Sequence, residues 1–185
     1  MFAIMPPEDL AHRIQTERVR FSENYNCFKG LKPPVHITLF EPFTLDERID
    51  DDLGNIEKLI KQQLPFKIEL HNYAFFENHV NPVVYINVVK NPALSELRKK
   101  FVAQITDDLP VDKSNSAYKP HFTIGYRDIP KAIFPRVMTD YSKRKFEGSF
   151  MLDRVFLWLH DSGNWQVDKE FLFNTGPQPV QAALF

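Results

Sequence analysis

The chain has 185 residues, of which 43% are hydrophobic and 25% charged, and its formal net charge is −1. This length and hydrophobic content are enough to bury the core of one domain, which excludes disordered and fibrous classes, and the balanced charge argues against binding along extended nucleic acid. No apolar run approaches the roughly 20 residues of a membrane span, and residues 1–7 lack the basic flank of a signal peptide, so we expect a soluble cytoplasmic protein with no membrane partner.

The first half of the chain shows a helical pattern, a short strand, a second helical pattern and two further strands. A proline pair followed by acidic residues predicts a helix from Pro6, with an apolar stripe of Leu10, Ile14 and Phe21. A strand is expected over 35–40. The next helical stripe consists of Ile49, Leu53, Ile56 and Ile60. Alternation over 66–70 and an apolar run over 82–89 predict the two strands that follow.

The second half repeats this order of elements. Asn91 and Pro92 combine a helix cap with a first-turn proline, and the apolar face behind them consists of Leu94, Leu97, Phe101 and Ile105. After a strand over 120–125, a weaker helix is expected over 131–141, where Pro135 interrupts the pattern. Strands are then expected over 146–160 and 165–171, joined by a hairpin turn made of Asp161, Ser162, Gly163 and Asn164.

The repeated order predicts an α/β (α+β) protein of two similar lobes related by a pseudo-two-fold axis. We expect residues 1–185 to form a single bilobal domain, with repeats of about 1–89 and 90–173. Residues 174–185 show little pattern and are expected to form a surface extension.

Each half carries a His-x-Thr motif at the same place in the repeat. Side chains alternate along a strand, so His36 and Thr38 share one face while the apolar residues between and beyond them face the lobe interior. The same holds for His121 and Thr123. If the lobes are related by a two-fold axis, the two polar faces can line one cleft. The alternative is a pair of half-buried structural histidines whose nitrogens are satisfied by nearby carbonyls.

Two imidazoles and two hydroxyls in one cleft suit phosphodiester chemistry without a metal. One neutral histidine can take a proton from water, and one protonated histidine can donate to the leaving oxygen, because the unperturbed imidazole pKa is about 6.5. The hydroxyls can hydrogen-bond the non-bridging oxygens as their charge rises. A cyclic phosphate fits especially well, since it needs only an activated water and a protonated leaving group.

The segments Pro34-Val35-His36-Ile37-Thr38-Leu39 and Lys119-Pro120-His121-Phe122-Thr123-Ile124 together resemble the paired signature of the two-histidine (2H) phosphoesterases. This family includes the RNA 2′,3′-cyclic phosphodiesterases also called 2′-5′ RNA ligases, and the resemblance spans nearly the whole chain. It implies two lobes of antiparallel sheet with outer helices and an active-site cleft between them. It also implies that the catalytic residues are His36, Thr38, His121 and Thr123. Family members often carry a cation just beyond the second motif, where Arg127 is the candidate.

Other candidates for substrate binding lie beside the two motifs. Tyr126 and Phe40 follow the motifs and either stack a base or pack in the core. Three lysines precede the motifs and either steer phosphate or are ordinary loop lysines: Lys29, Lys32 and Lys119.

No metal or other cofactor is expected. Cys27 is the only cysteine, which excludes a cysteine zinc site, and His71 and His79 have no carboxylate at ligand spacing. The dipeptide His160-Asp161 is of a kind found in metal sites, but it lies at the open end of a predicted hairpin and the sequence shows no further metal-binding motif to accompany it.

The leading hypothesis is hydrolysis of 2′,3′-cyclic phosphates on RNA ends or small nucleotides, and the resemblance implies a 2′-phosphomonoester product. The pseudo-symmetry leaves open which histidine is the base. The alternatives are 2′-5′ RNA ligation or 2′-5′ phosphodiesterase activity in the same site, or a non-catalytic module that binds RNA ends or nucleotides. The expected partner is therefore an RNA terminus or a small cyclic nucleotide, with no obligate protein partner.

Overall fold

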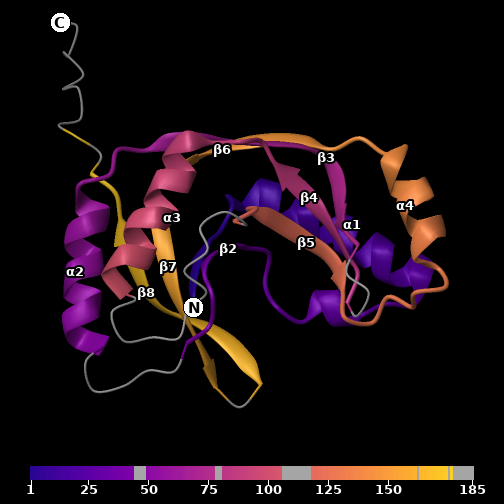
Figure 1. Cartoon of the computed structure of the whole chain (residues 1–185), viewed down its shortest axis with the longest axis horizontal. Coiled ribbons are helices and arrows are strands. Elements are labelled where there is room, and N and C mark those ends of the chain that lie inside the picture. Colours follow the sequence, from indigo (N-terminus) through magenta and orange to yellow (C-terminus); the bar gives the residue numbers. More distant parts are fainter. Residues whose placement is uncertain (44–48, 78–80, 106–117, 162, 175, 177–185) are drawn as a thin grey trace, which may run out of the picture.

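The protein consists of two antiparallel sheets with helices packed on their outer sides (Figure 1). The computed structural model describes residues 1–43, 49–77, 81–105, 118–161, 163–174 and 176. Among these residues, the first sheet contains four strands in the order β2 (Ile37–Phe40), β1 (Phe2–Ile4), β7 (Arg154–Asp161) and β8 (Asn164–Leu172). The second contains, in order, β5 (His121–Tyr126), β4 (Val83–Val88), β3 (Phe66–Phe76) and β6 (Glu147–Leu152). The predicted α+β class with antiparallel sheets is confirmed.

The helices divide between the two sheets. The first sheet is covered by α2 (Ile49–Lys61) and α3 (Pro92–Ile105), whereas α1 (Glu8–Tyr25) and α4 (Phe134–Ser142) pack against the second (Figure 1). A short 3₁₀ turn, η1 (Lys29–Leu31), leads from α1 toward β2. None of the described helices has the length and apolar character needed to cross a membrane.

Strands are exchanged between the two halves of the sequence. Each sheet takes two strands from residues 1–89 and two from residues 118–172, so neither lobe corresponds to one sequence repeat. The exchange takes place at Asp153, because the segment predicted as one strand over 146–160 is two strands in different sheets. The backbone carbonyl of Asp153 accepts a hydrogen bond from the amide of Phe173 at 2.7 Å, which fixes the crossing point.

Local signals explain where the helices begin. The Asn91 side chain accepts a hydrogen bond from the amide of Leu94 at 3.0 Å, as the predicted cap requires. In α4, by contrast, Pro135 lies in the first turn and does not interrupt the helix. A proline there loses no intrahelical hydrogen bond, because the first amides of a helix have no partner within it. The predicted extension, residues 174–185, lies mostly outside the described residues.

The pseudo-two-fold relation extends to the hydrogen-bond register of the motif strands. Ala3 on β1 lies opposite Thr38, and Tyr85 on β4 lies opposite Thr123. In both pairs the register shifts by one residue immediately beyond the threonine. Such a bulge bends the strand and changes the face to which later side chains point. The motifs therefore lie on strands bent at equivalent places.

Candidate active site

The two motifs alternate between buried and partly exposed positions, as the sequence predicts. Ile37 and Leu39 are fully buried on one side of β2, and Phe122 and Ile124 are fully buried on the same side of β5. The intervening Thr38 and Thr123 are half-buried, and so are the two histidines. The apolar side chains therefore anchor each strand while the polar side chains remain accessible.

The two imidazoles are held by the same hydrogen bond. Nδ1 of His36 lies 2.8 Å from the carbonyl oxygen of Pro34, and Nδ1 of His121 lies 2.7 Å from that of Lys119. A carbonyl oxygen can only accept, so Nδ1 carries the proton in both rings. In the neutral form, Nε2 of each ring is then the unprotonated nitrogen, which can accept a proton.

Aromatic side chains pack beside both imidazoles. The His36 ring lies 5.1 Å from the Trp158 ring, and the His121 ring lies 4.8 Å from Tyr85 and 5.1 Å from Phe76. These contacts exclude water from part of each imidazole and limit its rotation.

Burial lowers the pKa of both histidines below the ordinary value. For His36, the charges of Arg18 and His121 lower the pKa further, whereas the hydrogen bond to Pro34 raises it. For His121, the hydrogen bond to Lys119 raises the pKa and the charge of that lysine lowers it. Both imidazoles are therefore biased toward the neutral form, and His36 is close enough to His121 to respond to its charge.

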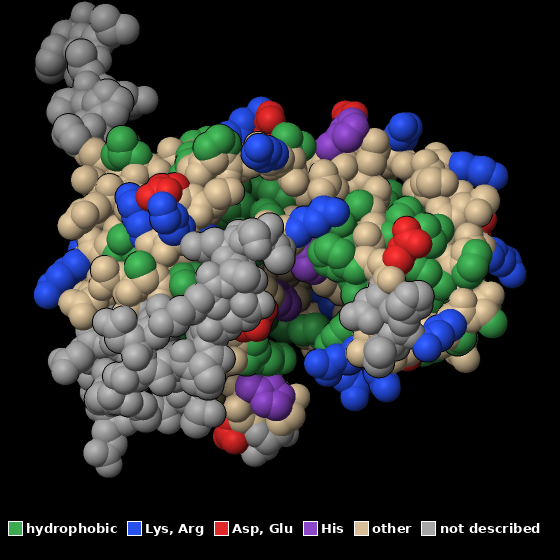
Figure 2. All heavy atoms as spheres, viewed as in Figure 1, with side chains coloured by type: hydrophobic (Ala, Val, Ile, Leu, Met, Phe, Trp, Pro, Cys, Tyr) green, Lys and Arg blue, Asp and Glu red, His purple; other side chains and the backbone are tan. Residues whose placement is uncertain are grey.

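A cleft of about 490 Å³ lies between the motif strands. Its walls include His36, Thr38 and Thr123, while His121 is not among the lining residues. Figure 2 shows histidine side chains in the hollow between the two lobes. The residue before the second motif reaches the first, because the Tyr118 hydroxyl donates a hydrogen bond to the carbonyl oxygen of Thr38 at 3.1 Å.

Three basic side chains line the same cleft: Arg18, Lys32 and Arg127. Arg127 is exposed, adopts a φ of 67° and holds its guanidinium 5.1 Å from the Tyr126 ring, which also lines the cleft. Neither Lys29 nor Lys119 is among the lining residues. The Lys119 ammonium instead lies over the rings of Phe76 and Tyr85.

Phe40 does not lie in the cleft, and the structure corrects its candidacy as a base-stacking residue. Its side chain is fully buried, packs edge-on against Phe43 and lies under the Arg98 guanidinium at 5.3 Å. Simple alternation would place Phe40 on the face of Thr38. The bulge beyond Thr38 turns it into the core.

The sequence interpretation missed several residues of the cleft. Arg18 is 2% exposed and donates hydrogen bonds to the carbonyls of Gly30 and Pro33, and burial lowers its pKa to about 10. It interrupts the apolar stripe of α1 between Ile14 and Phe21, which was the available signal. His160 and Trp165 reach the cleft from the β7–β8 hairpin, together with Gly163. In the described part of the chain, no three histidine, cysteine or carboxylate side chains are grouped so as to hold a metal. His79 lies outside that part.

Residues 6–164 match the family model described as the 2′-5′ RNA ligase superfamily. A similar protein from Geobacillus sp. (strain WCH70), named as a phosphoesterase, is 28% identical over 162 residues, 86% of this chain and 90% of the relative. The fold is similar to the crystal structure of TT0787 from Thermus thermophilus, with a TM-score of 0.67, 18% identity and coverage of 96% of this chain and 98% of that one. It is also similar to that of E. coli LigT complexed with 3′-AMP, with a TM-score of 0.61, 16% identity and coverage of 93% and 95%. The paired His-x-Thr motifs and the extent of the family match together show that this chain belongs to the 2′-5′ RNA ligase superfamily, the family of the two-histidine phosphoesterases.

Proposed function

We propose that this protein is a metal-independent phosphodiesterase that opens 2′,3′-cyclic phosphates on RNA ends or nucleotides and leaves a 2′-phosphomonoester. The observation that carries the proposal is the matched state of His36 and His121. Each donates Nδ1–H to the carbonyl two residues earlier, which leaves Nε2 of each ring for proton transfer.

The reaction needs one proton removed and one supplied. Nε2 of one neutral histidine accepts a proton from water as the water oxygen forms a bond to phosphorus. The bond between phosphorus and the 3′ oxygen breaks, and the other histidine, in its protonated form, donates a proton to that oxygen. Burial favours the neutral form of both rings. The anionic charge of a bound cyclic phosphate opposes this bias and stabilises the one protonated imidazole that the reaction requires.

The remaining polar groups of the cleft suit a phosphoryl group. The hydroxyls of Thr38 and Thr123 are available to hydrogen-bond the non-bridging oxygens, whose charge increases in the transition state. Arg127 and Lys32 add positive charge to the same cleft. The cleft volume of about 490 Å³ is in the range of small-molecule sites, which supports a nucleotide or an RNA end and not a long backbone.

Structures of a protein with the same fold support a nucleotide ligand. E. coli LigT has been crystallised with 3′-AMP and also with phosphate. Binding of both a phosphate and a nucleotide is what the proposed substrate requires. The alternative of 2′-5′ ligation consumes the same cyclic phosphate in the same site, with a 5′-hydroxyl in place of water as the nucleophile, so an assay that offers both nucleophiles separates the two reactions.

The test is hydrolysis of the four nucleoside 2′,3′-cyclic phosphates with and without EDTA, with ³¹P NMR to identify the phosphomonoester. We expect turnover that EDTA does not reduce and a 2′-phosphate product. His121→Ala and His36→Ala should each lose about 10²- to 10⁴-fold in kcat, the usual contribution of a general acid or base. His12→Ala is the control, because His12 is exposed on α1. A folded His121→Ala protein with near-wild-type turnover would overturn the mechanism.

A further inference from the structure

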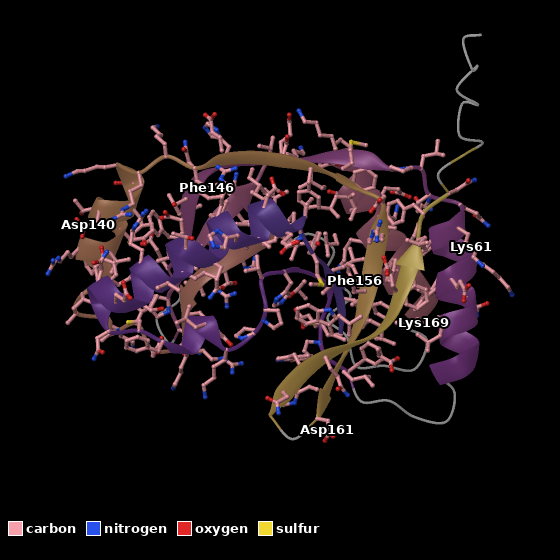
Figure 3. The ribbon with its side chains drawn as sticks, turned by 180° about the vertical axis from the view of Figure 1, so that it is seen from behind. Lys61, Asp140, Phe146, Phe156, Asp161 and Lys169 are labelled. Carbon is pink, nitrogen blue, oxygen red and sulfur yellow. The ribbon has the colours of Figure 1, made fainter. Side chains whose placement is uncertain are left out.

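The tip of the β7–β8 hairpin carries two rings that line the cleft. His160 and Trp165 are partners across the hairpin, and their ring centroids are 4.7 Å apart. Both line the same cleft as His36. Figure 3 shows the hairpin extending beyond the body of the protein, with Asp161 at its end. The rings therefore lie on this arm, on the side of it that lines the cleft.

These rings continue a row of aromatic side chains that begins at the active site. Trp165 lies 6.2 Å from Trp158, and Trp158 lies 5.1 Å from the His36 imidazole. Trp158 is only 1% exposed and belongs to a buried cluster with Met1 and Ala3. It therefore acts as a rigid support, whereas Trp165 is only partly buried.

Trp165 is half-buried and lines the cleft, so part of its indole is accessible there. Gly163 also lines the cleft, and nothing lies within 4 Å of the position a Cβ would take there. The opposite wall differs, because the Arg127 guanidinium lies over the ring of Tyr126. Among the cleft aromatics described, Trp165 thus offers a partly accessible indole beside a second ring.

A nucleotide has the dimensions that this arrangement needs. Its phosphate and its base are separated by one ribose, and the row of rings leads from the proposed phosphate position to the hairpin. Planar bases stack on aromatic side chains with little dependence on base identity. We propose that Trp165, supported by His160, is the stacking platform for the base of the nucleotide whose phosphate lies at the two histidines. This inference rests on the proposed function, since it takes the phosphate position from it.

The test compares ligands with and without a base. The dissociation constants of 2′-AMP and of inorganic phosphate are measured by calorimetry for the wild type and for Trp165→Leu, Trp165→Phe and His160→Ala. Val167→Ala is the matched control, because Val167 lies on the same strand, is 49% exposed and does not line the cleft. We expect Trp165→Leu to weaken 2′-AMP binding by about 5- to 100-fold, the range expected for one stacked base. Phosphate binding should be unchanged.

The conservative variant and fluorescence provide independent checks. Trp165→Phe keeps an aromatic face, so it should retain most of the affinity for 2′-AMP. The chain has two tryptophans, and Trp158 is buried, so quenching of indole fluorescence by 2′-AMP should disappear in Trp165→Phe. Equal loss of 2′-AMP and phosphate affinity in folded Trp165→Leu, or quenching that persists in Trp165→Phe, would overturn the platform.

The stacking role of Trp165 and the proposed reaction can be tested independently of each other. A second comparison uses kcat/KM for adenosine 2′,3′-cyclic phosphate and for a ribose 2′,3′-cyclic phosphate without a base. Trp165→Leu should lower the first and leave the second unchanged. If no cyclic phosphate is hydrolysed but 2′-AMP still binds through Trp165, the proposed reaction is wrong and the platform stands. If hydrolysis occurs and Trp165→Leu affects both substrates equally, the platform is wrong.

Discussion

The Tyr118 hydroxyl donates a hydrogen bond to the backbone carbonyl oxygen of Thr38 at 3.1 Å and so connects the segment before one motif to the strand of the other. Burial raises the pKa of Tyr118, so the hydroxyl remains protonated and able to donate at neutral pH. The Arg98 guanidinium lies 5.3 Å from the Tyr118 ring and limits its movement. This one side chain therefore helps to set the distance between the two halves of the site.

Tyr118→Phe should reduce kcat through the geometry of the cleft. The variant removes one hydrogen bond and keeps the ring, so the free energy of unfolding should fall by only about 0.5–1.5 kcal/mol. A displacement of about 1 Å between reacting groups can cost up to about 100-fold in rate. Tyr25→Phe is the matched control, because Tyr25 donates a similar bond to Asp140 and does not line the cleft. Equal kcat values for the two variants would show that Tyr118 has only a structural role.

The two histidines should act as a unit. If one removes a proton and the other supplies one, loss of either already prevents the concerted reaction. The double variant His36→Ala/His121→Ala should therefore be little slower than the slower single variant. The measurement is the initial rate of hydrolysis of one cyclic nucleotide by the wild type, the two single variants and the double variant, with circular dichroism to verify folding. Multiplicative losses would indicate two independent contributions.

The pH dependence of stability follows from the lowered pKa of each histidine. A folded-state pKa below the unfolded value of about 6.5 means that the unfolded chain binds more protons near that pH. The contribution of His36 and His121 to the free energy of unfolding is therefore present above pH 6.5 and is lost as the pH falls below it. Urea unfolding at pH 7.5 and 5.5 should show a smaller acid-induced loss in the double alanine variant than in the wild type. An equal loss of stability in the wild type and the double alanine variant would mean that other titratable groups cause the acid-induced loss.

Activity should depend on pH in a bell-shaped manner. The limbs of kcat/KM for a cyclic nucleotide report the coupled pair in the free enzyme. Burial lowers the pKa of both rings. Both limbs of the profile should therefore lie at lower pH than the limbs that two unperturbed imidazoles would give. A profile that rises steadily into alkaline pH would contradict a protonated histidine as the acid.

Gly125 should tolerate no side chain. A Cβ at this position would lie 2.1 Å from the Phe21 ring, which is fully buried and cannot move aside. Gly125→Ala should therefore destabilise the protein by about 1–3 kcal/mol or more. Gly54→Ala is the control, since nothing lies within 4 Å of its Cβ position and alanine favours the α2 helix by about 1 kcal/mol. Chemical denaturation of both variants should give changes of opposite sign.

The sequence predicted those parts of the site that depend on local pattern. Alternation around His36 and His121 placed the polar faces correctly, because each strand has one fully buried side. The sequence left open whether Phe40 stacks a base or packs in the core, because a bulge depends on the pairing strand and no residue at the bulge differs visibly from ordinary strand residues. The break at Asp153 was missed for a similar reason. No proline or glycine marks it, and only the competition between two distant sheets decides where the strand ends.

Residues brought to the site by tertiary packing were harder to predict. A hairpin between the last two strands was expected, and the pairing of Asp161 with Asn164 confirms it, while Ser162 lies outside the described residues. That its rings face the cleft depends on the pairing of β7 with β1, which the turn residues do not encode. Arg18 was likewise visible only as a charged residue in an apolar stripe.

The exchange of strands has a consequence for how the chain reaches its folded state during synthesis. Trp158 on β7 forms backbone hydrogen bonds with Met1, 157 positions away. The strand β1 therefore cannot pair with β7 until nearly the whole chain has been made. Until then β1 and β2 form a two-stranded ribbon, which is only marginally stable in water. Contacts this distant in sequence also slow folding. Chains released before β7 is complete would present the unpaired edge of β1 to other chains. We therefore expect truncated chains to aggregate.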